Sequence, residues 1–378
     1  MNPITVVIAP DSFKESMTAQ AAAAAMARGV RRVFPDACCV ERPMADGGEG
    51  TAEVLASALG ASRRSVTVRG PHGEPVSAEY ALAGDHTAIL DAASAIGLGL
   101  VAPDQRDPWR SSSQGLGDLM VAALDAGAQR LLIGLGGTAT TDGGAGMAQA
   151  LGVGLNDASG KPVDPTPEGL SELDQVDLTG LDPRLATTDI VIALDVTNPL
   201  LGPQGAAAVF GPQKGATPQM VPALDTVLAH WAHTLAAAGR PDLSNEPGAG
   251  AAGGLGFALL ALGATSRRGI DLVIETTGLE QQATSADLIL TGEGSVDAQT
   301  ANGKTAWGVA QVARRHHVPV IAFGGRVEPG AETMFDCAWS IVPGPVDLAT
   351  ALREGPANLE RSVEQALRAY RLGTLNQG

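Results

Sequence analysis

The stretch Gly134–Gly146, GLGGTATTDGGAG, follows the apolar run Leu131–Ile133 and packs six glycines and three threonines into thirteen residues. Glycine loses more conformational freedom on folding than any other residue. Such a run is therefore costly unless the backbone needs positive φ or the close approach of a ligand or another chain segment. An apolar run that ends in a polar, glycine-rich loop is typical of a parallel strand whose carboxyl end faces a ligand. We therefore predict an α/β fold with a ligand site at this loop.

Strand and helix patterns alternate on both sides of this stretch. The opening ITVVIAP and the later segments ADLILTGEG and VPVIAFGG read as strands, and helical patterns separate them. Short alternating runs between Arg64 and Asp91 indicate antiparallel hairpins. A chain of 378 residues usually forms more than one domain. We predict that residues 1–69 plus 285–378 form one parallel-sheet domain and that residues 70–284 form an inserted mixed α/β domain.

The composition limits the class of partner. Hydrophobic residues make up 44% of the chain and aromatic residues only 3%, which suits helices stacked on a sheet. The net charge of −16 argues against a nucleic-acid or membrane-surface partner, because phosphate backbones are bound through clustered Lys and Arg. The start lacks a basic leader, and the run at 251–264 is too short and glycine-rich to span a bilayer. We expect a cytoplasmic protein, either a monomer or a homodimer.

Four predicted strand ends run into polar, glycine-rich loops, and this pattern predicts a phosphate ligand. The loops are APDSFKES, PMADGGEGT, GLGGTATTDGGAG and LTGEGSVDAQTANGKT. Loop amides and helix N-termini at such positions hold phosphates. Three of the four lysines, Lys14, Lys214 and Lys304, lie in motif-like segments, whereas arginine supplies most of the other basic charge. Lysine is a compact charge on a flexible stem and suits a phosphate that moves during a reaction.

Seven acids lie in or beside these glycine and threonine loops rather than on helix faces. Mg²⁺ is usually held by one or two carboxylates plus substrate phosphates, and an alcohol nucleophile needs a carboxylate to accept its proton. Two or three acids are enough for both tasks, and the others are expected to form caps and turns. The seven acids are Asp11, Asp46, Glu49, Asp142, Asp195, Glu293 and Asp297.

Other functions stay open at this point. The segment TANGKT resembles the end of a P-loop, but the P-loop pattern needs a glycine where Ala298 stands. Gly134, Gly136 and Ala139 satisfy a dinucleotide-binding pattern, and Asp157 follows at about the spacing of a ribose-binding acid. An NAD(P)-dependent hydroxy-acid oxidoreductase is therefore one alternative. A non-catalytic sugar-acid binding module is another, although the chain shows no basic helix-turn-helix segment.

Five motifs in order carry a family resemblance: APDSFKESMTA, ADGGEGT, GLGGTATTDGGAGMAQALG, LDVTNPLLGPQGAAAVFGPQKGA and LTGEGSVDAQTANGKT. Together they resemble the bacterial glycerate kinases of the first type over nearly the whole chain. The resemblance implies ATP-dependent phosphorylation of D-glycerate with Mg²⁺, giving 2-phosphoglycerate rather than 3-phosphoglycerate. It also implies two α/β domains, one of them Rossmann-like, with the active site in the cleft between them.

With this resemblance, the candidate residues take roles in phosphoryl transfer, which needs positioning and charge neutralisation more than covalent chemistry. We expect Lys14, Lys214 and Lys304 to supply mobile positive charge and Asp46 or Asp195 to accept the glycerate hydroxyl proton. Candidate magnesium ligands are Asp142, Glu293 and Asp297. The candidate substrate-binding and phosphate-binding residues are Asp11, Ser12, Gly47, Gly48, Glu49, Gly136, Gly137, Thr138, Thr140, Asn198, Thr291, Gly292, Gly294, Thr300 and Lys304.

Overall fold

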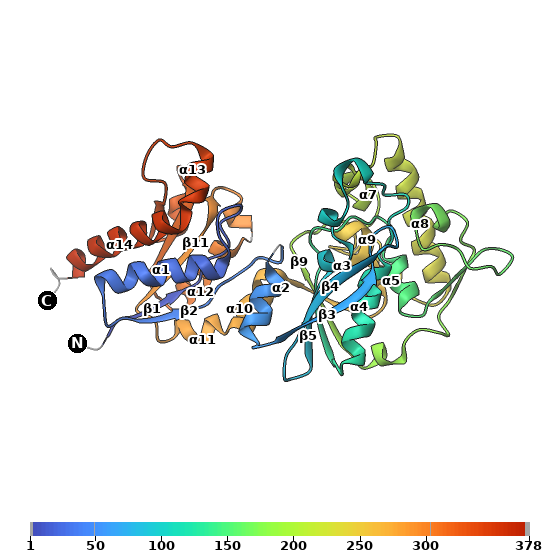
Figure 1. Ribbon diagram of the computed structural model, residues 1–378, viewed down its shortest axis with the longest axis horizontal. Helices are drawn as coiled ribbons and strands as arrows, with labels where there is room; N and C mark the ends of the chain where they lie inside the picture. Colours follow the sequence, from blue (N-terminus) through green and yellow to red (C-terminus); the bar gives the residue numbers. More distant parts are fainter. Residues whose placement is uncertain (1–2, 49, 303, 375–378) are drawn as a thin grey trace. The chain divides into compact units, whose positions relative to one another are not determined.

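The protein is described by a computed structural model that covers residues 3–48, 50–302 and 304–374 (Figure 1). The chain forms two compact units. Unit 1 contains the chain up to Asp46, the segment Glu53–Leu59 and the chain from Gly269 onward. Unit 2 contains Gly47–Ala52 and Gly60–Arg268. Each unit is α/β, as the sequence predicts.

Unit 1 is built on a five-stranded, wholly parallel sheet in the order β13-β12-β11-β1-β2. In the register, Ile8 pairs with Leu290 on one side and with Glu41 on the other, so strands from the two ends of the chain are direct neighbours. The predicted parallel sheet formed by both chain ends is confirmed. The strands are β1 (Thr5–Ile8), β2 (Cys38–Glu41), β11 (Leu288–Val296), β12 (Val320–Val327) and β13 (Cys337–Ser340).

Helices cover both faces of this sheet. The helices α1 (Ala19–Val33) and α14 (Gly355–Thr374) pack together over one face (Figure 1). The side chain of Thr18 caps α1 by accepting a hydrogen bond from Ala21 N–H. The other face carries α12, with α10 and α11 beside it. The remaining helices of this region are α2 (Thr51–Ala58), α10 (Gly269–Thr277), α11 (Leu279–Ala283), η5 (Thr300–Asn302), α12 (Thr305–Arg315), η6 (Ala331–Met334) and α13 (Leu348–Arg353).

Unit 2 is built on a mixed six-stranded sheet in the order β10-β9-β6-β5-β4-β3. Strands β3, β4 and β5 form the predicted antiparallel hairpins. Strands β5, β6, β9 and β10 pair in parallel. A separate antiparallel pair joins β7 to β8. The strands are β3 (Ser62–Arg69), β4 (Pro75–Leu82), β5 (Thr87–Asp91), β6 (Arg130–Gly134), β7 (Gly154–Asn156), β8 (Gln175–Asp177), β9 (Asp189–Leu194) and β10 (Thr265–Arg268).

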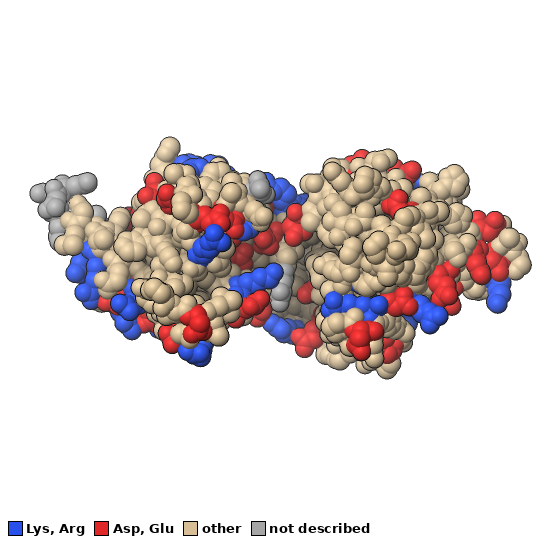
Figure 2. All heavy atoms as spheres, turned by 90° about the horizontal axis from the view of Figure 1, so that it is seen from above, with Lys and Arg blue, Asp and Glu red and all other residues tan. Residues whose placement is uncertain are grey.

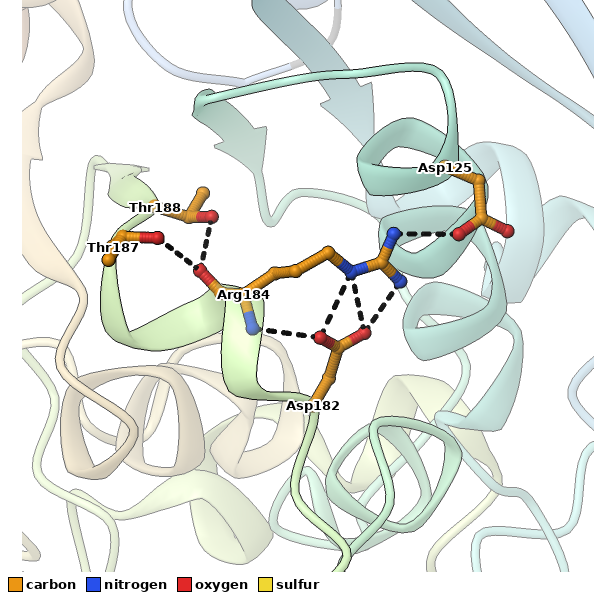
Figure 3. A network of polar contacts seen from close by, with 5 residues as sticks. All are labelled: Asp125, Asp182, Arg184, Thr187 and Thr188. Carbon is orange, nitrogen blue, oxygen red and sulfur yellow. Dashed lines mark hydrogen bonds and ion pairs between the residues drawn. The ribbon is translucent and has the colours of Figure 1, made fainter.

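The core of unit 2 lies between this sheet and its helices, with the buried side chains of Trp231 and Phe257 at its centre. At the surface, Arg184 joins Asp182 to Asp125 at the end of α4 (Figure 3). The helices are α3 (Ala92–Ile96), η1 (Leu98–Leu100), η2 (Pro103–Gln105), α4 (Gln114–Asp125), α5 (Ala145–Ala150), α6 (Pro167–Leu170), η3 (Pro183–Ala186), α7 (Ala206–Phe210), η4 (Pro212–Lys214), α8 (Met220–Ala237) and α9 (Ala251–Ala261).

The unit boundaries differ from those expected at residues 69/70 and 284/285. Strand β3 pairs with β4 along its whole length, so residues 62–69 belong to the sheet of unit 2. At the second boundary, α10 and α11 pack against α12, which places residues 269–284 in unit 1. Both differences arise from pairing and packing partners that lie beyond the local pattern.

Charged side chains are dispersed over the visible surface. Figure 2 shows Lys and Arg in small groups interleaved with Asp and Glu on one face, without a continuous basic area. Among the described residues, no helix is long and apolar enough to cross a membrane.

Candidate functional site

The first polar centre of interest lies in unit 1, at the carboxyl ends of β1 and β11. The strand order places β2 on one side of β1 and β11 on the other, so the chain direction across the sheet reverses between β1 and β11. In open α/β sheets, ligands bind outside the carboxyl ends of the strands at such a reversal. Asp11 follows β1, and Glu293 lies within β11. We call these two carboxylates with Thr300, Lys304 and Thr305 the acid centre.

Asp11 and Glu293 are both poorly solvated. Burial raises the pKa of Asp11 to about 6, although the hydrogen bond from the Thr305 hydroxyl and other contacts oppose the shift. Burial also raises the pKa of Glu293 to about 7, against the charge of Lys304. Glu293 is only 7% exposed, and its carboxylate accepts a 3.0 Å hydrogen bond from Thr300 Oγ1. The charge of Asp11 further raises the pKa of Glu293, so the two carboxylates repel each other.

The start of α12 contributes a positively charged side chain to the acid centre. Lys304 is the N-cap residue of this helix, and its Nζ lies 3.5 Å from Glu293 and 3.4 Å from Asp297. Burial raises the pKa of Asp297, but the backbone hydrogen bond from Gln299 and the charge of Lys304 outweigh it and lower the pKa overall. The N-terminus of a helix also favours anions. The acid centre thus combines two desolvated carboxylates with a cationic helix start.

The structure places several other predicted residues of unit 1 beside the acid centre. The Ser12 N–H donates to Asp11 Oδ1, and the charge of Asp46 raises the pKa of Asp11 further after burial. Thr291 is buried, and its hydroxyl donates to the Ala9 carbonyl, so it links β11 to β1. Lys14 is exposed in the turn that follows Ser12. Glu49 lies outside the described residues.

Of the two predicted glycines of β11, Gly292 has a packing reason to be glycine. A Cβ at Gly292 would lie 2.4 Å from the Phe323 carbonyl oxygen, which leaves no room for any side chain. At Gly294 the nearest atom would be the backbone nitrogen of Lys14, at 3.4 Å. The first glycine therefore lets β11 and β12 pair closely, whereas a side chain at the second would make only an ordinary contact with the Lys14 turn.

The second polar centre lies in unit 2, where β6 ends. We call residues 134–144 the glycine loop. Gly137, Gly143 and Gly144 have φ between 66° and 77°, a conformation that favours glycine. A Cβ at Gly136 would lie 3.8 Å from the Cα of Gly48, so two of the predicted loops meet in this unit. Gly47 is held there by a hydrogen bond from its N–H to the Thr51 hydroxyl.

Lys214 is hydrogen-bonded to the glycine loop. Its side chain is 2% exposed, and its Nζ donates to the Thr140 carbonyl at 2.6 Å and lies 3.4 Å from Thr138 Oγ1. Burial lowers the pKa of Lys214 from its usual 10.5 to about 7, against the charge of Asp142. The expectation of a mobile charge is wrong for this residue, because a buried amine with these partners is anchored. Lys214 is a positioning group for the loop.

Asp142 is enclosed by hydrogen-bond donors. It is fully buried and accepts hydrogen bonds from the Ser113 N–H and hydroxyl and from the N–H groups of Gly144 and Gly146. Burial raises its pKa, while the hydrogen bonds from Ser113 oppose the rise. These contacts saturate the carboxylate, so the structure gives Asp142 a role in holding the glycine loop against the start of α4. They leave no place for the magnesium ion expected there.

Asp195 and Asn198 follow the neighbouring strand β9. The register pairs Gly134 with Ala193, so the glycine loop and Asp195 leave the sheet at the same edge. Asp195 is exposed. The Asn198 side chain donates to the Gln204 carbonyl at 2.8 Å and closes its own loop. Of these two predicted residues, Asp195 has the accessibility that a proton acceptor needs.

The dinucleotide alternative does not fit the structure. Asp157 accepts hydrogen bonds from the N–H groups of Ser159 and Lys161 in an exposed turn after β7, so it serves that turn. The glycine loop is also followed by only a short helix, α5, which begins at Ala145 rather than directly after the glycine pattern. A dinucleotide-binding turn would need both features in other places.

Three residues at these centres are not among the candidate site residues. The Thr305 hydroxyl donates a hydrogen bond to Asp11. The hydroxyl of Ser113, the N-cap residue of α4, donates one to Asp142. Thr141 adjoins Thr140, and within the described chain neither of these two buried hydroxyls has a hydrogen-bond partner. Buried hydroxyls without partners are uncommon and suit a place where a ligand binds. The motif TANGKT signalled Thr305, whereas no local pattern signalled Ser113.

The acid centre has the donor chemistry for Mg²⁺. Mg²⁺ prefers hard oxygen ligands and often binds through one or two carboxylates together with substrate phosphates. Asp11 and Glu293 supply two carboxylates whose mutual repulsion and desolvation a divalent cation would relieve. No group of three or more Asp, Glu, His or Cys residues arranged for a metal occurs within the described ranges. The residues present therefore fit a cation shared with phosphate oxygens rather than an all-protein site.

Comparison with known proteins points to one family. A family model described as the glycerate kinase family matches residues 6–371. The chain is 46% identical over 373 residues to a glycerate kinase from Bacillus subtilis, covering 97% of this chain and 98% of the relative. It is 43% identical to the glycerate 2-kinase from Escherichia coli, covering 99% and 100%. A crystal structure from Salmonella typhimurium LT2, provisionally assigned as glycerate kinase 2, matches with a TM-score of 0.91 at 44% identity, covering 99% and 100%.

Proposed function

Because the chain belongs to the glycerate kinase family, and so is a kinase that acts on an alcohol group, we propose that it transfers the γ-phosphoryl group of ATP to the 2-hydroxyl of D-glycerate. The name of the Escherichia coli relative, glycerate 2-kinase, supports the choice of hydroxyl. The product of the proposed reaction is 2-phosphoglycerate.

The acid centre of unit 1 is the observation that carries this proposal. Phosphoryl transfer depends on positioning the phosphates and neutralising their charge. Lys304 and the N-terminus of α12 present positive charge directly beside Asp11 and Glu293. Lys14 is exposed on the adjoining turn and can follow a phosphate as it moves. We assign the triphosphate of ATP to this centre.

Mg²⁺ is part of the proposal, with Asp11 and Glu293 as the residues that would hold it. When bound, the ion neutralises the charge of the phosphate oxygens. Thr300 and Thr305 orient the two carboxylates through their hydroxyl groups. Asp297 pairs with Lys304 and keeps the ammonium group near the start of α12. Asp142 is no longer a candidate because its oxygens are already occupied.

We assign glycerate to the glycine loop of unit 2. Gly136 and Gly137 are exposed in this loop, and Lys214 fixes the loop through the Thr138 hydroxyl and the Thr140 carbonyl. Such amide-rich turns bind anions. Asp195 is the proposed general base. As the glycerate O2 attacks the γ-phosphorus, Asp195 accepts the hydroxyl proton, an O2–P bond forms and the bond from the γ-phosphorus to the ADP oxygen breaks. That the active site lies in a cleft between the units stays a prediction.

Phosphorus NMR tests the reaction and the product together. Purified protein is incubated with ATP, Mg²⁺ and D-glycerate, and the new resonance is compared with authentic 2-phosphoglycerate and 3-phosphoglycerate. A signal at the position of 2-phosphoglycerate is expected. A 3-phosphoglycerate signal would overturn the choice of hydroxyl, and intact ATP with folded protein would overturn glycerate as the substrate. L-Glycerate serves as the control for stereochemistry.

A further inference from the structure

A pocket at the end of β2 is the feature that leads beyond the proposed reaction. It has a volume of about 280 Å³ and is lined by residues of unit 1 alone, among them Gln20, Glu41, Arg42, Pro43 and Val54. None of these residues takes part in the acid centre. The pocket opens at the carboxyl edge of the same parallel sheet, one strand away from β1.

We propose that this pocket binds the nucleoside of the phosphoryl donor, with the ribose at Glu41 and the base against Pro43 and Val54. The inference rests on the proposed function, since it names the place of the nucleoside whose phosphates lie at the acid centre. Under this proposal, the whole nucleotide binds to unit 1.

The position of Glu41 supports the ribose assignment. Glu41 is the last residue of β2 and pairs with Ile8 of β1. In dinucleotide-binding α/β folds, an acid at the end of the second strand accepts hydrogen bonds from ribose hydroxyls while phosphates bind beyond the first strand. The loop after β1 here lacks the dinucleotide glycine pattern, but the same two positions carry a pocket acid and a phosphate-type centre.

The spacing between the two positions suits one ligand. The backbone of β1 continues extended from Ile8 to Asp11, because Asp11 N–H donates to the Gly292 carbonyl and Met44 N–H donates to the Pro10 carbonyl. Three residues along the strand and one strand across place the Cα atoms of Glu41 and Asp11 about 11 Å apart on the diagonal. A triphosphate chain can bridge that separation.

The walls of the pocket suit a heteroaromatic base. Pro43 and Val54 provide apolar contact, and Ala58 leaves room at the end of α2. Arg42 lies beside them, with one N–H donated to the Glu41 carbonyl at 2.9 Å. A planar guanidinium group stacks on aromatic rings, so Arg42 can cover one face of the base. Gln20 adds an amide that can read the edge of the base.

A first variant and its matched control test the pocket without touching the acid centre. Ala58→Trp fills the pocket from an exposed position at the helix end, and Ala357→Trp makes the same change on an exposed residue of α14 as the matched control. The dissociation constant of Mg·ADP is measured by isothermal titration calorimetry. We expect at least a tenfold weakening for Ala58→Trp and less than a twofold change for the control.

A second variant tests the ribose contact. Glu41→Leu removes the carboxylate but keeps a strand-forming side chain, and the ratio of the dissociation constants of 2′-deoxy-ADP and ADP is compared with that of the wild type. We expect the preference for ADP to fall at least fivefold. Circular dichroism and urea unfolding check that both variants are folded.

The outcomes separate this inference from the proposed function. If Ala58→Trp and Glu41→Leu bind both nucleotides as the wild type does and still turn over glycerate, the pocket assignment is overturned and the kinase proposal stands. If the wild type neither binds Mg·ADP nor phosphorylates glycerate, both fall together.

Discussion

At the scale of single residues, Lys214 has the environment that differs most from that of a surface lysine. Its amine is buried and its pKa lies near 7, whereas the same group in the unfolded chain titrates near 10.5. Between these two values the unfolded chain binds one more proton than the folded chain. The free energy of unfolding should therefore rise with pH over this range, by about 1.4 kcal/mol per pH unit for one proton.

We predict that Lys214→Met removes this rise. The difference in the free energy of unfolding between wild type and variant should grow in favour of the wild type as the pH increases from 7 to 10. Urea unfolding at pH 7, 8, 9 and 10 measures it, and titrating groups that do not interact with Lys214 cancel in the difference. Lys161→Met, at an exposed position, should keep the wild-type pH dependence. Parallel curves for wild type and Lys214→Met would show that the amine is not desolvated.

Asp195 carries the prediction for the chemical step. Asp195→Asn keeps the size of the side chain but cannot accept a proton, so we expect kcat to fall by about 10²- to 10⁴-fold. The KM for glycerate should change little. Asp189→Asn is the matched control, because Asp189 lies at the opposite end of the same strand and pairs with Arg130 at the surface. Near-normal turnover of Asp195→Asn would leave Asp46 as the candidate base.

The residue roles were the least predictable part of the site. Lys214 and Asp142 could be predicted from the sequence because lysines are rare and acids gather in glycine loops, but both turn out to be buried and bonded to neighbouring chain segments. Burial depends on Ser113 and η4, which arrive from distant parts of the chain. A local motif shows which residues gather at a site. It does not show which of them reach the ligand.

At the scale of elements, β11 shows how the backbone constrains the acid centre. Gly292 lies between Thr291 and Glu293, where β11 pairs with β12. We predict that Gly292→Ala lowers the free energy of unfolding by roughly 1–3 kcal/mol, because the new methyl group would overlap the Phe323 carbonyl and force the strands apart. The shift should also move Glu293 and reduce activity in the remaining folded protein.

Urea unfolding measures this loss, and Gly344→Ala is the control. A Cβ at Gly344 would meet no atom within 4 Å, so that variant should keep the stability of the wild type. Equal stability of the two variants would mean that β11 and β12 can move apart at little cost.

Most elements could be predicted from their local patterns. Thr18 and the alanine-rich run after it define the start of α1, and the alternation after Arg64 defines the hairpins of unit 2. The pattern from about Val346 to Arg371 predicts a single last helix, but the structure has two, because Glu354 separates α13 from α14. Ends of elements depend on contacts that a local pattern does not contain.

At the scale of the whole molecule, the chain forms two separate hydrophobic cores, and unit 1 is assembled from segments at both ends of the chain. The core of unit 1 joins Ile8 of β1 to Leu290 of β11 and Leu367 of α14. The similar strand patterns at the two ends made this union predictable. The boundaries were not, since they depend on β3 pairing with β4 and on α10 packing beside α12.

This organisation leads to a prediction about where each substrate acts. Hydrogen exchange followed by mass spectrometry should show that Mg·ADP slows amide exchange in residues 9–17 and 288–302 of unit 1, because bound phosphates hold the loops after β1 and β11. D-Glycerate should slow exchange in residues 134–144 and 195–200 of unit 2. Residues 154–177, which carry the β7–β8 pair, are the internal control and should not change with either compound.

The two ligands distinguish the assignments of the units. Protection of residues 134–144 by Mg·ADP alone, with residues 288–302 unaffected, would reverse the roles of the two centres and move the phosphates to the glycine loop. Protection in the expected segments would support the assignment of nucleotide to unit 1 and of glycerate to unit 2. The reason is physical: an amide exchanges only when its local structure opens, and a bound ligand makes that opening more costly by its own binding free energy.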